Sequence, residues 1–147
     1  MMKKNIYLLV MSALFVWGCE SNKVDISMEL EKLAVSHVTD TVRFRLINLI
    51  KEDFDSYLIV PPYTNIKKAE EKIGIEISKI NETGIDIRDD IYVLCLFKDN
   101  TMTNFYELSR NTIDYSELSD LSLNKKEVEL ILVKQLEIYH ITKASVR

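Results

Sequence analysis

Ile91-Tyr92-Val93-Leu94-Cys95-Leu96-Phe97 is an unbroken apolar run near the middle of the chain. A short apolar run rich in β-branched and aromatic residues is typical of a buried strand. Lys98-Asp99-Asn100-Thr101 follows it, and Asp and Asn tolerate the left-handed backbone that hairpin turns require. Residues 102–108 are therefore expected to return as the second strand, with alternate residues sharing one face: Met102, Asn104, Tyr106 and Leu108.

The segment before this hairpin predicts one strand and one helix. Tyr57-Leu58-Ile59-Val60 reads as a strand, and Pro61-Pro62 ends it because proline has no N–H for the ladder. A helix is expected to begin at Thr64 or Asn65, with Gly74 as its left-handed cap. Its buried face would carry apolar residues at helical spacing, namely Ile66, Ala69 and Ile73.

The amino-terminal part of the domain has a weaker pattern. Residues 26–53 are expected to be mainly helical, although residues 32–38 also alternate as a strand would. The helical reading rests on apolar residues at i, i+4, i+7 and i+8, which are Val42, Leu46, Leu49 and Ile50. Residues 75–87 are read either as a pair of short edge strands or as an irregular connection.

The carboxyl-terminal part favours strands. Val128–Val133 is rich in β-branched residues, and residues 136–141 would continue that strand or pair with it. A helix also fits, because Val128, Ile131, Leu132 and Leu136 share a helix face. The sum predicts an α+β fold, an antiparallel sheet of four or five strands with two or three helices packed on one face.

The amino terminus has the layout of a secretory signal. Lys3 and Lys4 precede residues 6–17, an uncharged stretch too short for a confident membrane span. Val16-Trp17-Gly18-Cys19 then resembles the lipobox of bacterial lipoproteins, with Trp17 where that family usually has a small residue. The resemblance implies signal-peptidase recognition of Val16, Trp17 and Gly18, and transfer of a diacylglyceryl group to the thiol of Cys19.

This reading divides the chain into a signal peptide (1–18), a lipidated cysteine with its tether (19–25) and one α+β domain (26–147). The domain would lie on the non-cytoplasmic side of a bacterial cell membrane or outer membrane, attached to the bilayer through acylated Cys19. Removing Lys3 and Lys4 from the chain's 19 basic residues leaves 17 against 23 acidic ones, a formal charge of −6. That balance argues against nucleic-acid binding and against electrostatic docking onto anionic lipids.

The sequence carries no recognisable catalytic set, metal-site motif or cofactor motif. His37 and His140 have no metal-ligand spacing around them, and Gly74 and Gly84 are the only glycines after the signal, too few for a phosphate-cradling loop. Asp86, Asp89 and Asp90 lack the spacing of a calcium loop. Cys95 is expected to be a small core residue.

A candidate partner-binding region lies at the junction of the predicted strand and helix. Pro62, Tyr63 and Thr64 would offer a stiff turn with an aromatic contact, and Arg110, which follows the hairpin, could lie nearby. The alternative is a purely structural role, in which the prolines stiffen the turn, Tyr63 packs against the start of the helix and Arg110 pairs with a carboxylate. The same Pro-Tyr-Thr turn, hairpin, arginine and final strand loosely resemble small uncharacterised bacterial envelope lipoproteins, and this resemblance implies no activity.

These observations predict a non-enzymatic lipoprotein that contacts another envelope or extracellular protein through a sheet edge or through the Pro62–Thr64 and Arg110 region. An exclusion or immunity lipoprotein, or a small-ligand-binding module, is the alternative. A concave apolar pocket would favour the small ligand, and a flat apolar patch the protein partner.

Overall fold

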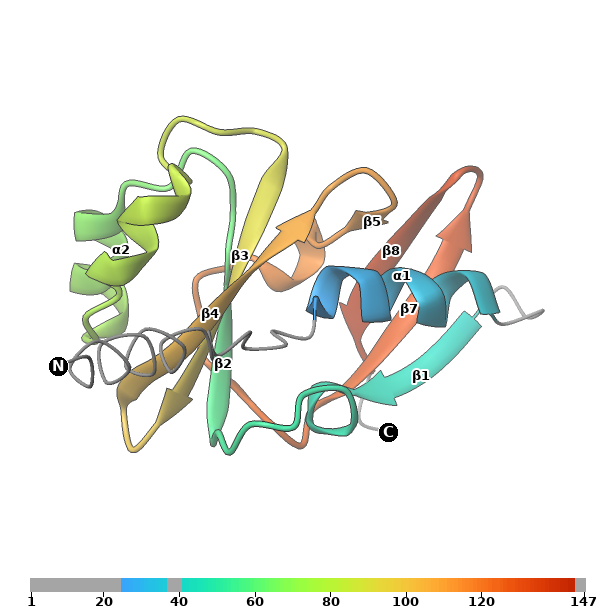
Figure 1. Ribbon diagram of the computed structural model, residues 1–147, viewed down its shortest axis with the longest axis horizontal. Helices are drawn as coiled ribbons and strands as arrows, with labels where there is room; N and C mark the ends of the chain where they lie inside the picture. Colours follow the sequence, from blue (N-terminus) through green and yellow to red (C-terminus); the bar gives the residue numbers. More distant parts are fainter. Residues whose placement is uncertain (1–24, 37–40, 145–147) are drawn as a thin grey trace, which may run out of the picture.

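The computed structural model describes residues 25–36 and 41–144, and this part of the chain has an α+β fold, as predicted. Figure 1 shows two helices and the strands of two sheets. In chain order the elements are α1 (Ile26–Ser36), β1 (Thr41–Arg45), η1 (Leu46–Asn48), β2 (Ser56–Val60), α2 (Ile66–Ile73), η2 (Ser78–Thr83), β3 (Ile91–Lys98), β4 (Thr101–Ser109), β5 (Ile113–Asp114), η3 (Ser116–Leu118), β6 (Asn124–Lys125), β7 (Glu129–Gln135) and β8 (Ile138–Lys143). None of the described helices is long and apolar enough to cross a bilayer.

The strands form two sheets, so the prediction of a single antiparallel sheet is wrong. Sheet A has the order β1-β7-β8-β5 and is mixed, because β5 runs parallel to β8 while the other pairs are antiparallel. Sheet B has the order β4-β3-β2-β6 and is antiparallel throughout. The hairpin predicted around residues 98–101 is the β3–β4 pair of sheet B.

Sheet B is covered on both faces, which is why β3 is apolar along its whole length. Successive side chains of a strand point to opposite faces. Tyr92, Leu94 and Leu96 accordingly pack with α1 and sheet A, whereas Val93, Cys95 and Phe97 pack with α2. The two helices thus lie on opposite sides of sheet B and at opposite ends of the view in Figure 1, so the expectation of helices on one face is also wrong.

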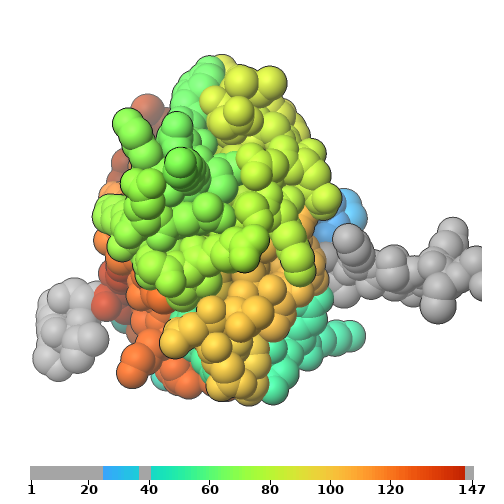
Figure 2. Space-filling model, turned by 90° about the vertical axis from the view of Figure 1, so that its left-hand side faces the viewer, coloured from blue at the N-terminus to red at the C-terminus, as the bar shows by residue number. Residues whose placement is uncertain are grey.

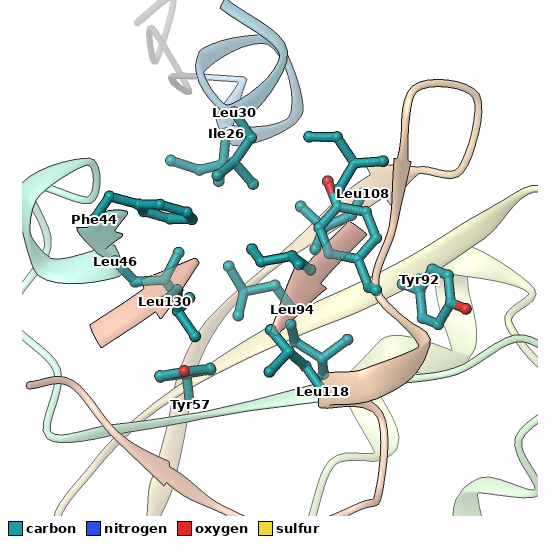
Figure 3. Close-up of a cluster of buried hydrophobic side chains, with 14 of the residues drawn as sticks. Ile26, Leu30, Phe44, Leu46, Tyr57, Tyr92, Leu94, Leu108, Leu118 and Leu130 are labelled. Atoms are coloured by element: carbon teal, nitrogen blue, oxygen red, sulfur yellow. The ribbon is translucent and has the colours of Figure 1, made fainter. Parts of the chain in front are cut away.

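We call the larger cluster the central core. Figure 3 shows ten of its labelled side chains converging from α1, both sheets and the connecting segments. Its buried members are Ile26, Leu30, Ala34, Val42, Phe44, Leu46, Ile50, Phe54, Tyr57, Ile59, Tyr92, Leu94, Leu96, Leu108, Ile113, Tyr115, Leu118, Leu130, Leu132 and Ile141. Because these residues span α1 to β8, burial of this cluster ties the two sheets together.

The smaller cluster, the outer core, fills the space between sheet B and the segment 66–85. Figure 2 looks onto this side, where α2 and the following connection cover the sheet. Its buried members are Leu58, Val60, Ile66, Ala69, Ile77, Ile80, Ile85, Ile91, Val93, Cys95, Phe97 and Met102. Cys95 is fully buried here, as predicted, and burial raises the pKa of its thiol to about 12.

The helix predicted from the spacing of Val42, Leu46, Leu49 and Ile50 is wrong, because β1 occupies Thr41–Arg45. Within β1 only Val42 and Phe44 are buried, with exposed residues on either side of each. That alternation has the period of a strand, and pairing with β7 buries its apolar face in the central core. The helical prediction for the preceding part is confirmed by α1, in which Ile26, Leu30 and Ala34 face inward.

α2 forms as predicted, with both of its caps. The Asn65 side chain accepts a hydrogen bond from the Lys68 N–H at 3.0 Å, and Gly74 adopts a left-handed φ of 72°. Residues 75–87 form an irregular connection around η2 rather than edge strands. Ile77, Ile80 and Ile85 anchor that connection in the outer core.

A β-bulge changes the predicted face of β4. Leu96 pairs with Asn104 but Phe97 pairs with Met102, so Thr103 is an extra residue in the ladder. Met102 consequently faces the outer core while Leu108 faces the central core, and the prediction that they share a face is wrong. At the carboxyl end, the strand reading is confirmed, since β8 pairs antiparallel with β7.

Two tyrosine hydroxyls in the central core, those of Tyr57 and Tyr115, are buried and have no hydrogen-bond partner among the described residues. Burial also raises the pKa of each. An unpaired buried hydroxyl costs free energy, whereas its removal with conserved shape is nearly neutral or stabilising. Since Tyr57 has no exposed surface, its hydroxyl has lost water as well.

Tyr57→Phe is therefore expected to leave the free energy of unfolding unchanged or to raise it by about 1 kcal/mol in urea denaturation. Tyr92→Phe is the matched comparison, because the Tyr92 hydroxyl donates to Asp114 at 3.3 Å and its loss should destabilise the domain. A clear loss of stability in Tyr57→Phe would mean that its hydroxyl does have a partner.

Candidate functional site

The Pro61–Thr64 turn carries an exposed aromatic side chain on a constrained backbone. The Thr64 hydroxyl donates to the Pro61 carbonyl at 2.6 Å, and Thr64 is buried. Tyr63 has a φ of 57°, in the left-handed region that a residue with a Cβ seldom adopts, and 62% of its surface is exposed. Pro62 is half-buried beside it. The turn thus presents the Tyr63 ring outward, and Thr64 holds the turn in shape.

Arg110 lies directly after β4 and is held by the adjacent backbone. Its N–H donates to the Asp90 carbonyl at 3.1 Å, and its Nη1 donates to the Asp89 carbonyl at 2.7 Å. The guanidinium carbon also lies 5.5 Å from the centre of the Tyr92 ring, within cation–π range. Arg110 therefore secures the junction between β4 and the start of β3. Among the described residues its partners are carbonyls and a ring, rather than the carboxylate of the alternative reading.

The predicted partner-binding residues lie at the same end of sheet B but are not joined to one another. Val60 pairs with Val93 and Ser109 pairs with Ile91, which places the turn and Arg110 beyond the same end of β3. Tyr63 follows β2 and Arg110 follows β4, with β3 between the two strands. Within residues 41–144, no hydrogen bond, ion pair or ring contact links Tyr63 with Arg110.

Of the acidic residues before β3, Asp90 forms an ion pair with Arg88. Arg88 donates to both carboxylate oxygens of Asp90, at 2.8 and 2.7 Å, and its Nη1 donates to Glu107 at 2.9 Å. The hydrogen bond from Arg88 lowers the pKa of the Asp90 carboxyl. This bidentate geometry fixes the loop against β4 and leaves Asp90 as a structural carboxylate.

A polar cluster that the sequence did not single out centres on Asp114. The Ser116 N–H and hydroxyl each donate to its carboxylate at 3.0 Å. Tyr92 donates to it at 3.3 Å, and His140 Nδ1 lies 3.4 Å from Oδ2. Because these partners come from β3, η3 and β8, only the folded chain brings them together.

Electrostatically, Asp114 is held as a carboxylate. Burial by itself would raise its pKa, but the hydrogen bonds from Ser116, the charge of His140 and the Tyr92 hydroxyl outweigh burial and lower it. The arrangement is not that of a catalytic triad, in which the serine hydroxyl bonds to the imidazole. Here the Ser116 hydroxyl bonds to the carboxylate, so the cluster braces β5 and η3 against β8 and β3.

Asp114→Ala is expected to lower the free energy of unfolding at pH 7 by about 1–3 kcal/mol, because it removes several hydrogen bonds at a partly buried site. Since the folded pKa of Asp114 is lowered, its contribution is complete above the unfolded pKa of about 3.9 and is lost as the pH falls through the folded value. The stability gap between wild type and variant, from urea titrations across pH, should therefore narrow in acid. Exposed Asp86→Ala is the control, and a gap that stayed constant would contradict this account.

At the long edge of sheet B, formed by β4, two backbone N–H groups are bonded to side chains. β4 pairs with β3 on one side, and the Ser109 N–H on its outer side is bonded to the Ser27 hydroxyl at 3.2 Å. The Phe105 N–H is likewise bonded to the Asn104 side chain at 2.9 Å. With the bulge at Thr103, these two bonds interrupt the row of backbone groups that a partner strand would pair with.

The hollows on the described surface include three that are open to solvent. One lies along the outer side of α1 and is lined by Met28, Glu31, Lys32, Val35 and Ser36, and two flank η2. Among the described residues no three histidine, cysteine, aspartate or glutamate side chains gather as a metal site would require. His37 and the lipobox residues Val16, Trp17, Gly18 and Cys19 lie outside the described residues.

Comparison with protein-family models, with curated proteins and with solved structures found no match to this chain.

Proposed function

We propose that the chain is a bacterial lipoprotein, anchored in a cell membrane or outer membrane through acylated Cys19, with its folded domain on the non-cytoplasmic side. The observation that carries the proposal is the lipobox-like Val16-Trp17-Gly18-Cys19, placed after two lysines and a short apolar run. Two or three acyl chains would hold the protein firmly, since each buried methylene contributes about 0.8 kcal/mol.

The folded domain, residues 26–147, serves in this proposal as a non-enzymatic binding module for another envelope or extracellular protein. Tyr63 supports that role, because it is a large, exposed aromatic ring on a backbone whose left-handed φ is costly for a tyrosine. Rigid aromatic side chains are frequent energetic centres of protein interfaces. Pro62 and Thr64 fix the turn. Arg110 would contribute to the interface indirectly, because it holds the Tyr92 ring and the loop before β3 in place.

The anchor is tested by intact mass spectrometry of the full chain from the membrane fraction, beside a Cys19→Ala variant. We expect a mature wild-type chain that begins at Cys19 and carries the mass of its acyl groups. The variant should remain unprocessed and lack that mass. An unmodified wild-type chain would contradict the lipoprotein proposal.

The binding role is tested in the same cells by crosslinking. Tyr63→Ala should lose a crosslinked partner that wild type retains, whereas Ile87→Ala, which removes another exposed apolar side chain, should keep it. A Tyr63→Ala chain that folds and retains every crosslinked partner would remove Tyr63 from the proposed interface.

A further inference from the structure

The outer face of α1 carries apolar side chains that nothing in the described structure covers. Met28 and Val35 are two helical turns apart and are 52% and 73% exposed. With Lys32 between them they line an open groove along the helix. The opposite face of α1 is fully engaged, because Ile26, Leu30 and Ala34 are buried in the central core.

The two helices differ in what they present to solvent. The outward residues of α2 are charged, namely Lys67, Lys68, Glu71 and Lys72, which is the usual surface of a helix on a soluble domain. On α1 the one lysine of the exposed stripe, Lys32, is paired with Glu29 at 2.8 Å. Glu31 lines the same groove, so the stripe carries one net negative charge beside Met28 and Val35. These two side chains are the part of the stripe that suits an apolar contact.

The length of chain between Cys19 and α1 limits where this face can lie. Seven residue steps separate Cys19 from Ile26, and a fully extended chain spans at most about 3.3–3.6 Å per residue, or about 25 Å here. If Cys19 is acylated, as the proposed function states, the first turn of α1 lies within that distance of the bilayer surface. Met28 belongs to this first turn, so its side chain is within reach of the lipid.

We propose that the Met28–Val35 face of α1 rests on the lipid bilayer, as a second contact beside the acyl anchor. Apolar residues of such a helix would enter the boundary between headgroups and acyl chains, and the long Lys32 side chain would extend its ammonium toward the headgroups. The inference rests on the proposed anchoring of Cys19. It fixes which side of the domain faces the membrane, and α2 with its charged face then points away.

The test uses the full chain, expressed in a bacterial host and purified from its membranes, with acylation verified by mass. An environment-sensitive fluorophore is attached to Val35→Cys or, as the matched control on the other helix, to Glu71→Cys. Cys95 does not compete for the label because it is fully buried and its thiol has a raised pKa. The protein is reconstituted into vesicles of phosphatidylethanolamine and phosphatidylglycerol that contain a spin-labelled quencher lipid.

We expect the label at residue 35 to shift its emission to the blue and to be quenched by the lipid, and the label at residue 71 to do neither. A label at Ser36→Cys should also be quenched when Met28 and Val35 are intact. Adding Met28→Ser and Val35→Ser should abolish most of that quenching. An acylated protein whose label at residue 35 behaves like that at residue 71 would overturn the inference alone.

Two further outcomes are decisive. Shielding of residue 35 that depends on protein density in the vesicle, without lipid quenching, would mean that a second copy covers the face and would overturn the inference. Absence of the acyl groups in the mass spectrum would overturn the anchor, and this inference with it.

Discussion

Leu94→Ala is expected to lower the free energy of unfolding by about 2–5 kcal/mol, the range for truncation of a fully buried leucine. Leu94 lies at the middle of β3 with no exposed surface, and β3 is an inner strand of sheet B. Figure 3 shows its side chain at the centre of the central core, between groups from α1 and from sheet A. The cavity would lie where both sheets and α1 meet, so collapse of one element cannot fill it.

Urea unfolding followed by circular dichroism measures this effect. Val35→Ala is the control, because that side chain is largely exposed in the absence of membrane and surface substitutions usually change stability by less than about 0.5 kcal/mol. A Leu94→Ala variant as stable as Val35→Ala would contradict the position of Leu94 at the junction of the two sheets.

The elements that the sequence predicted correctly are those with strong local signals. β3 was found from continuous apolar character, and the β3–β4 turn from Asp99 and Asn100, which have φ values of 49° and 58°. α2 was found from its cap at Asn65 and its end at Gly74. In each of these the local backbone preference and the tertiary environment agree, so a short window of sequence is informative.

β1 was missed because two periodicities compete over the same residues. Val42, Leu46 and Ile50 are spaced as on a helix, but Val42 and Phe44 are spaced as on a strand. The deciding factor is remote: β7 lies almost ninety residues away in the chain and supplies the hydrogen bonds and the buried surface. A pattern within residues 41–50 does not contain that information.

The arrangement of layers was also beyond local reasoning. Both the odd-numbered and the even-numbered residues of β3 are buried, which shows that both of its faces are covered. This pattern does not show that a second sheet covers one of them. The bulge at Thr103 likewise depends on how the β4 ladder meets β3, and it moved Met102 to the other face.

For the candidate site, turn chemistry located the Pro61–Thr64 segment, whereas the Asp114 cluster depends on three distant elements. Pro61 and Pro62 mark a strand end directly, and Thr64 bonds within the same turn. Tyr92, Asp114 and His140 are far apart in the chain and have no common motif. The remaining signal was that each follows or precedes an apolar strand residue, which is too common to be informative.

β1, the strand in the segment that the sequence predicted as helical, should make neighbouring proline substitutions differ strongly in their loss of stability. The Ala144 N–H donates to the Glu129 carbonyl, so odd-numbered residues of β7 direct their backbone groups toward β8 and even-numbered ones toward β1. Leu132, opposite Val42, therefore exchanges ladder hydrogen bonds with it, and the N–H of Arg43 points away from the sheet. Val42→Pro should destabilise the domain far more than Arg43→Pro.

We expect Val42→Pro to cost on the order of 3 kcal/mol beyond the loss seen in Val42→Ala, which controls for the missing side-chain packing. The cost arises because proline removes an N–H from the ladder and leaves the carbonyl of the buried Leu132 without its donor. Arg43→Pro removes an outward N–H and an exposed ion pair with Glu129, so it should cost less than about 1 kcal/mol. Thermal and urea unfolding of the three variants give the comparison. Equal losses for the two proline variants would indicate a helix over these residues, and the reverse order would indicate a strand shifted by one residue, because a one-residue shift exchanges the inward and outward N–H groups.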